Sequence, residues 1–360
     1  MFFLGQFFLI LVCLFSLGPK ALAEPRFAVE EGVGCNSCHT NLTGAGKRND
    51  TGGAQYMHKL MIEAFRDLEE KKLKDIGGRI NQYIAVGADF RTHNRTLLGS
   101  APKNSFTLPQ GSLYVELNAG PHLAGYADYD LANTSSREIF GMVHDLPAGL
   151  YFKAGRINLP YGLRIDDDTS PIRSNLSLTY ASQDIGGEVG LFPGPFEMAL
   201  AVSNGVPGGM GDENLAKAIT SSINWIGAAG RLGASFQWNK KTANRLTTGG
   251  LNGGFHLGRF VLLGEGDLQQ IQSRTGAGTT YLMAAYGEMD FKLVEGFYLR
   301  AIYDYLDPDY RTANNFAQRV SAGIDLFPLP FSQVSLLYRA NFGPLPLGPN
   351  EIFGQIHFFF

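Results

Sequence analysis

Two cysteines and a histidine near the N-terminus have the spacing of a covalent haem site. Cys35 and Cys38 enclose two residues, and His39 follows directly, which gives the pattern C-x-x-C-H. In this pattern the two thiols form thioether bonds to the haem vinyl groups, and the histidine ligates the iron on its proximal side. We therefore predict one covalently attached haem c, bound by Cys35, Cys38 and His39.

The segment before this motif has the features of an export signal. Met1 to Gly18 is almost continuously apolar, and Ala21-Leu22-Ala23 is a small-residue cleavage signature. We predict a signal peptide over residues 1–23, with cleavage before Glu24. Cleavage removes Cys13, so the two motif cysteines are the thiols that remain of the three in the sequence. Neither is then spare for a structural disulfide or a zinc site, which strengthens the haem interpretation.

The second axial ligand of the predicted haem is open. The apolar periodicity of residues 54–74 predicts a helix behind the motif. His58 is the favoured distal ligand on this helix, and Met57 and Met61 are the alternatives. The iron could also be ligated by a residue of the barrel or have no second protein ligand. A histidine would give a lower reduction potential and a methionine a higher one.

From Gly78 onward the hydrophobic period changes to two. In the segment 297–306, for example, Leu299 and Tyr303 fall on one face while Arg300 and Asp304 fall on the other. The chain contains 45 glycines, 26 phenylalanines and 15 tyrosines, and it stops on Phe360. These features favour an outer-membrane barrel over a soluble β-sandwich. We predict an all-β protein with an antiparallel barrel of 14–16 strands over residues 77–360, behind a small helical haem module over residues 24–76.

One predicted connection is unusually long. Residues 158–186 show little strand pattern and contain the triplet Asp166-Asp167-Asp168. A loop of this length is functional or disordered, and in general porins the loop at this place folds into the lumen. The triplet is either a site for a hard cation or part of a solvated loop. Charged residues of the strands are expected to face the lumen: Arg300, Asp304, Glu265, Asp267, Asp128, Asp130, Arg339 and His357.

Other classes of function find little support in the residues. The formal net charge of −3 gives no basic excess for nucleic acid. No glycine-rich phosphate loop, zinc-protease motif or nucleophile elbow occurs in the sequence. We expect an electron-transfer protein rather than an enzyme that converts a substrate.

The N-terminal motif resembles that of a known family. The run Pro25-Arg26-Phe27-Ala28, then Gly32 and the haem motif, is similar to the start of the fused monohaem cytochrome–porins of iron-oxidising bacteria. This resemblance implies that the haem docks at the barrel, at its periplasmic side or in its lumen. It also implies that single electrons cross the outer membrane between a periplasmic carrier and an extracellular donor or acceptor such as iron. The alternative is a solute or ion porin whose haem module is a plug or sensor.

Overall fold

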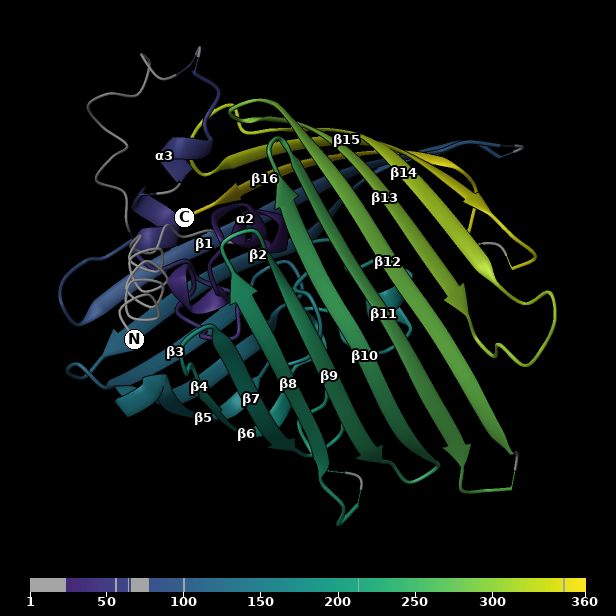
Figure 1. Ribbon diagram of the computed structural model, residues 1–360, viewed down its shortest axis with the longest axis horizontal. Helices are drawn as coiled ribbons and strands as arrows, with labels where there is room; N and C mark the ends of the chain where they lie inside the picture. Colours follow the sequence, from purple (N-terminus) through teal and green to yellow (C-terminus); the bar gives the residue numbers. More distant parts are fainter. Residues whose placement is uncertain are drawn as a thin grey trace, which may run out of the picture.

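The computed structural model describes residues 24–360 except 56, 64, 66–77, 100, 213, 277 and 346. The predicted signal peptide, residues 1–23, therefore lies outside the described residues, as does the boundary predicted at residues 76 and 77. Within the described chain, sixteen strands pair antiparallel with their sequence neighbours, and the last strand pairs with the first (Figure 1). The prediction of a closed all-β barrel is confirmed, at the upper end of the predicted strand number.

The strands follow one another around the barrel in sequence order. Their bounds are β1 Ile84–Leu97, β2 Lys103–Asn118, β3 Leu123–Asp130, β4 Ser135–Leu146, β5 Leu150–Ile157, β6 Asp184–Leu191, β7 Phe196–Ser203, β8 Ala218–Gly227, β9 Gly230–Lys240, β10 Asn244–Leu257, β11 Phe260–Ser273, β12 Thr279–Val294, β13 Phe297–Asp307, β14 Ala317–Leu326, β15 Ser332–Phe342 and β16 Glu351–Phe359. The short helical elements are α2 Pro25–Glu31, a 3-10 turn Cys35–Ser37, a π turn Thr51–Gln55, α3 Met57–Leu60, a 3-10 turn Pro147–Gly149 and α4 Pro171–Ser174.

The alternation read from the sequence sets the two faces of the wall. Along β16, Ile356 and Phe358 are exposed on the outside, whereas His357 and Phe359 are buried toward the lumen. The charged residues predicted to face the lumen are buried or nearly so, including Asp304 and Arg339. An apolar outer face around a polar lumen is what a barrel needs in order to stand in lipid.

The two ends of the barrel differ in their connections. At one end the turns are tight, as between β8 and β9 at residues 228–229, and the chain ends there with Phe360 bonded to Ala88 in β1. At the other end lie long loops, such as 158–183 and 204–217. We call these the short-turn end and the long-loop end. In bacterial barrels the short turns face the periplasm and the long loops face outward.

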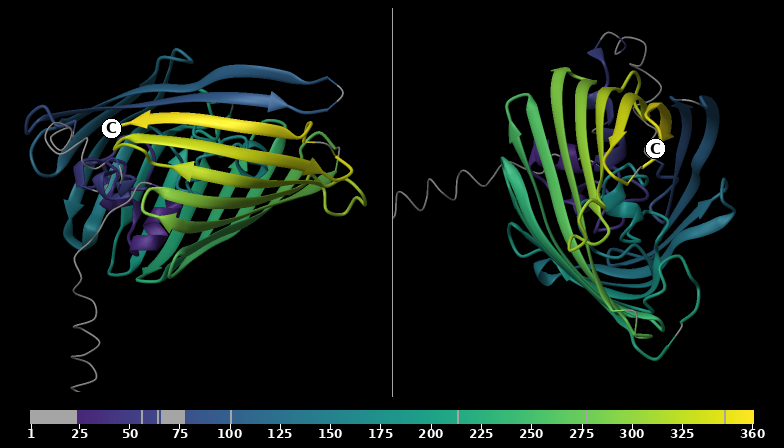
Figure 2. Two further views of the ribbon diagram at one scale, coloured as in Figure 1. Left: turned by 90° about the horizontal axis from the view of Figure 1, so that it is seen from above. Right: turned by 90° about the vertical axis from the view of Figure 1, so that its right-hand side faces the viewer.

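Residues 24–55 of the N-terminal segment lie inside the barrel at the short-turn end, beside the C-terminus (Figure 2), whereas helix α3 stands at the rim of that end (Figure 1). Helix α2 begins with Pro25, whose missing N–H costs nothing at a first helical position. It ends at Gly32, which adopts a left-handed φ of 66° and packs so closely on the 228–229 turn that a Cβ would lie 2.9 Å from the Cα of Ala228. Glycine is therefore required here by both backbone and space.

The helix predicted over residues 54–74 is wrong in its extent. Helix α3 ends at Leu60, and residues 66–77 lie outside the described residues. Leu60 and Met61 are fully buried, and the Ile62 N–H donates to the carbonyl of Phe327 in the β14–β15 connection at 3.0 Å. A longer helix would use the Ile62 N–H for an intrahelical hydrogen bond, but here this N–H is bonded to the barrel. Among the described residues, no helix has the length and apolar character needed to span a bilayer.

Candidate functional site

The C-x-x-C-H segment forms one tight turn with its own hydrogen bonds. The amides of Cys38 and His39 both donate to the carbonyl of Cys35, at 3.2 and 3.1 Å. The Cys35 amide in turn donates to Oε1 of Glu197 in β7 at 3.1 Å. This turn carries the side chains of Cys35 and His39 to adjoining positions inside the lumen, and the barrel wall fixes its start.

Cys35 and His39 line one cavity, and His39 also lines a second that adjoins it. The first leaves a free volume of about 40 Å³, and the second one of about 80 Å³. Arg164 from the 158–183 loop contributes to both cavities. Arg231 and Tyr161 add to the first, whereas Arg48 and Tyr180 add to the second. Each cavity has room for a few water molecules.

Cys38 lies elsewhere. Its side chain is fully buried in a mostly aromatic cluster of Phe27, Leu60, Tyr298, Phe327 and Phe359. The two thiols are not joined in a disulfide. Burial raises the pKa of the Cys38 thiol, and burial together with the Glu197 carboxylate raises that of Cys35 while Arg231 opposes the rise. Neither cysteine therefore has the depressed pKa of a reactive thiolate.

The structure leaves the predicted distal ligands open. Met57 and His58 belong to α3, but their side chains lie outside the described residues. Met61 is completely buried and is not among the side chains that line the two cavities. The choice among His58, Met57 and Met61 stays a prediction.

Buried ion pairs fasten the N-terminal segment to one side of the barrel. Arg26 is 2% exposed, and its guanidinium contacts Asp290 of β12 at 3.1 Å and Asp325 of β14 at 2.8 Å. Glu24 lies 2.8 Å away. Burial opposes the charged form, but the three carboxylates outweigh it and raise the pKa of Arg26 well above its ordinary value. Arg26 is thus a permanent cation that ties helix α2 to two strands.

We expect Arg26→Gln to lower the free energy of unfolding by about 1.5–3 kcal/mol. The two buried carboxylates of Asp290 and Asp325 lose one partner and keep Arg300, at 3.8 and 3.3 Å. Denaturant titration of the refolded protein in detergent measures this change. The matched control is Arg79→Gln, since Arg79 is 44% exposed in its pair with Asp50. That change is expected to cost about 0–1 kcal/mol. Equal effects of the two substitutions would contradict the anchoring role of Arg26.

A second set of contacts fastens the segment to the opposite strands. Asn41 donates to the carboxylate of Glu138 in β4 at 3.0 Å and accepts from Nζ of Lys153 in β5 at 2.9 Å. Nζ of Lys47 lies 3.2 Å from Glu116 in β2. The C-x-x-C-H turn thus stands between two anchored stretches and is held across the width of the lumen.

The loop 158–183 folds into the lumen, as loops at this place do in general porins. After β5 it crosses to the far wall, where Tyr161 donates to Asp267 at 2.9 Å and the Leu163 amide to Glu265 at 2.7 Å. Arg173 of helix α4 forms an ion pair with Glu265, and Ser170 bonds to Asp304 of β13. The expectation that this loop folds into the lumen is confirmed.

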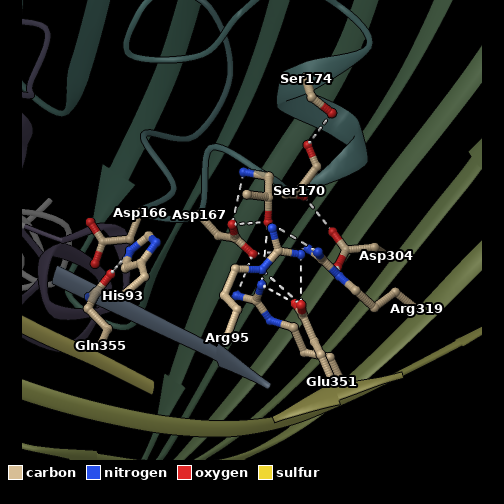
Figure 3. A network of polar contacts seen from close by, with 12 residues as sticks. His93, Arg95, Asp166, Asp167, Ser170, Ser174, Asp304, Arg319, Glu351 and Gln355 are labelled. Atoms are coloured by element: carbon tan, nitrogen blue, oxygen red, sulfur yellow. Dashed lines mark hydrogen bonds and ion pairs between the residues drawn. The ribbon is translucent and has the colours of Figure 1, made fainter. Parts of the chain in front are cut away.

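The aspartate triplet of this loop does not gather its carboxylates. Asp167 lies 3.0 Å from Arg319 of β14 and 2.9 Å from Arg339 of β15 (Figure 3). Burial alone would raise the pKa of Asp167, but the two arginines prevail and lower it. Asp166 faces Arg91 at 3.7 Å, and Asp168 accepts from the Tyr180 amide. The hard-cation interpretation is wrong, because arginines already neutralise this part of the loop.

The loop and the N-terminal segment meet around the two cavities. Nε of Arg164 donates to the carbonyl of Thr43 at 3.3 Å, four residues beyond His39. Gly44, with φ of 87°, lies beside Cys35 so that a Cβ would stand 3.2 Å from its sulfur. The cavities lined by His39 are therefore enclosed by the anchored segment on one side and the inward loop on the other.

Solved structures of porins share this architecture. OmpT of Vibrio cholerae matches with a TM-score of 0.61 at 11% identity, covering 77% of this chain and 99% of the other. The fold is that of the outer-membrane porins. OmpF of Salmonella typhi, solved with daunomycin, gives 0.58 at 11% identity over 77% and 97% of the two chains. An anion-selective porin of Comamonas acidovorans gives 0.56 at 11% identity over 77% and 99%.

Comparison of the sequence with protein families and with curated proteins found no relative. No family model matches the chain, and no curated protein matches it. Identities near one residue in ten show a shared fold and leave the function of this chain to its own residues.

Sequence reasoning missed several residues of the site. Neither Arg164 nor Arg231 is among the predicted site residues, although both line the cavity beside Cys35. Tyr161 and Arg164 belong to a segment without strand pattern, and Arg231 opens a strand right after a tight turn. Arg231 could have been found from the sequence, because it is a charged residue at an inward-facing position of an alternating strand. No comparable signal exists for a loop residue.

Proposed function

We propose that the chain carries one haem c on Cys35 and Cys38, with His39 as proximal ligand, and conducts single electrons across the outer membrane. The observation that carries this proposal is the position of the C-x-x-C-H turn. It stands inside the lumen of a barrel, between an anchored segment and an inward loop. A cofactor held there is separated from lipid by the barrel wall and lies between the two mouths.

The residues present fit such a group. Cys35 and His39 line one cavity together, and Gly44 keeps the space next to the Cys35 sulfur free of a side chain. The lining of the same cavity combines two arginines, Arg164 and Arg231, with two acidic residues, Glu24 and Glu197. Attachment through both thiols requires the Cys38 side chain to leave its aromatic cluster, and the haem requires the side chains around the cavity to make room for it.

The chain's own residues then have distinct tasks. Haem supplies a one-electron iron couple whose potential follows its axial ligands and surroundings. Cys35 and Cys38 fix the group covalently, and His39 binds the iron. Glu197 fixes the turn at the Cys35 amide. Arg26 and Asn41 hold the segment to opposite walls, so that the group cannot swing out of the lumen.

The partners follow from the two ends. The N-terminal segment lies at the short-turn end, where we place the periplasmic electron carrier. The extracellular donor or acceptor, with iron as the expected example, approaches from the long-loop end. The apolar outer face meets outer-membrane lipid.

A solute or ion porin with a haem plug is the second candidate. Its support is the likeness to the structures named as porins, together with a lumen lined by charged side chains. The segment that enters the lumen counts against free passage, since it is fastened to both walls. The two candidates differ in what crosses the membrane, and this difference can be measured.

Electron transfer across a sealed bilayer tests the proposal. Proteoliposomes hold an impermeant reductant inside and an impermeant ferric chelate outside. The parent protein should reduce the chelate well above the rate of empty vesicles, and His39→Ala should fall to that rate because the iron loses its protein ligand. Heat-shifted gel mobility verifies that the variant barrel is folded. Equal rates for parent and variant would exclude His39 from the path and favour the porin.

A further inference from the structure

Four basic residues gather on the rim of the barrel at the long-loop end. Lys240 ends β9, Lys241 lies in the following turn, Arg245 is the second residue of β10, and Arg274 directly follows β11. The turns after β9 and β11 lie side by side (Figure 1), and the Arg274 amide donates to the carbonyl of Ala243 at 2.8 Å. We call Lys240, Lys241, Arg245 and Arg274 the basic rim cluster.

Lys240 and Arg245 belong to the outer face of the barrel wall. Side chains of a strand alternate between its two faces, so Lys240 shares the lipid-facing side of Phe236 and Arg245 that of Leu251. Trp238 lies on the same face, between Lys240 and the apolar band. Tryptophan is enriched where a membrane meets water. The two cations therefore stand at the height of the lipid headgroups, on the side that faces outward.

The positive charge of the cluster is not balanced by the protein part that the structure describes. Lys240 and Arg245 are direct cross-strand partners, and like charges at such positions destabilise a sheet. The guanidinium of Arg245 donates to Oε1 of Gln272, which is a neutral group. Among the described residues, none of the four cations has an ion-pair partner within 4.0 Å. Two acidic residues of the adjoining loops already have basic partners: Asp212 pairs with Lys217, and Asp309 with Arg311.

Arg274 is held in place by the neighbouring turn. Its Nη1 donates to the carbonyl oxygens of Lys241 at 3.0 Å and Thr242 at 3.2 Å. These bonds use one nitrogen of the guanidinium, and the side chain remains exposed. The planar fork of a guanidinium matches two oxygens of a phosphate group. An oriented arginine beside three further cations is therefore suited to an anion that carries more than one charge.

We propose that the basic rim cluster binds the phosphate groups of a lipid in the outward-facing leaflet. A lipid fits better than a free anion, because Lys240 and Arg245 face the lipid side and stand directly beyond the apolar band. The acyl chains of the same molecule would lie along exposed side chains of that band, such as Phe236 and Leu251. This inference goes beyond the proposed electron transfer and does not depend on the haem.

The test measures binding of bisphosphorylated lipid A to the full-length protein in a neutral detergent, by native mass spectrometry. The double variant Lys240→Gln with Arg245→Gln should bind about 30-fold more weakly, because two basic groups near the headgroup are lost. The charge-preserving double variant Lys240→Arg with Arg245→Lys should bind like the parent. Lys217→Gln is the matched control, since Lys217 at the same end is already paired with Asp212. It should leave lipid binding unchanged.

Stability in detergent gives a second readout with the opposite sign. Without lipid, the glutamine double variant should unfold at the same temperature as the parent or higher, because the repulsion between Lys240 and Arg245 is removed. Lipid A should raise the unfolding temperature of the parent and leave that of the variant nearly unchanged. Heat-modified gel mobility measures this transition and restricts the comparison to folded barrels. The single variant Arg245→Gln serves where the double variant folds poorly.

Three results would overturn the inference. The first is equal binding of lipid A by the parent and the glutamine variants. The second is equal binding of the dephosphorylated lipid by the parent, which would reduce the contact to the acyl chains. The third is stabilisation of the parent by inorganic phosphate to the extent that lipid A reaches at the same phosphate concentration, which would identify a site for free anions. All three leave the haem proposal untouched, because the haem stain of the same preparations tests it separately.

Discussion

Replacing Cys35 and Cys38 together by serine is expected to abolish the haem-stained band on a denaturing gel. These are the two thiols that remain after the predicted cleavage, and they stand at thioether spacing. A serine hydroxyl does not form the thioether bond, so any haem still present would be held by His39 alone and lost on denaturation. Cells with a working cytochrome maturation system are needed for the comparison.

A spacer substitution controls for changes in the turn itself. Ser37 lies between the two cysteines in the 3-10 turn, and Ser37→Ala leaves both thiols and His39 in place. It should keep the stained band at the parent level. Haem that survives denaturation in the double serine variant, or a parent that never stains, would remove the basis of the haem proposal.

The barrel was predictable because its wall repeats one simple rule. Alternation such as that of β13 is set by lipid outside and polar lumen inside, and each strand obeys it independently. The terminal strand, with Phe358 outward and Phe359 inward, follows the same rule. The fold class could therefore be predicted from the local sequence of the individual strands.

The interior was less predictable because it depends on contacts between distant residues. Helix α3 ends where Ile62 bonds to Phe327, which lies far along the chain. Asp167 reads as a possible cation ligand until Arg319 and Arg339 are placed beside it. Cys35 and His39 are predicted from their spacing alone. Arg231 lies beside them because the N-terminal segment enters the lumen next to strand β9. The hydrophobic periodicity of the sequence does not indicate which distant residues contact one another.

The second large effect concerns the passage of ions. An unfilled sixteen-stranded barrel leaves an aqueous channel. Here the lumen holds the N-terminal segment, pinned by Arg26 and Asn41 to opposite walls, and a loop pinned by Asp167 to two arginines. We expect the full-length chain in planar bilayers to conduct close to the background leak. The proposed haem site would then be insulated from bulk electrolyte.

Removal of residues 24–77 behind the signal peptide should raise the conductance to that of an open porin-sized channel. Because the deletion strips Asp290 and Asp325 of Arg26, the variant also carries Asp290→Asn and Asp325→Asn, which limits the cost of unpaired buried charge. The full-length chain with the same two substitutions is the matched control and should stay closed, since Asn41 and Lys47 still hold the segment.

An open parent channel would show that the pinned segment does not seal the lumen, and the solute porin would then be the better account. A closed parent that opens on deletion identifies the segment as the seal, which is the arrangement that electron conduction without solute leak requires.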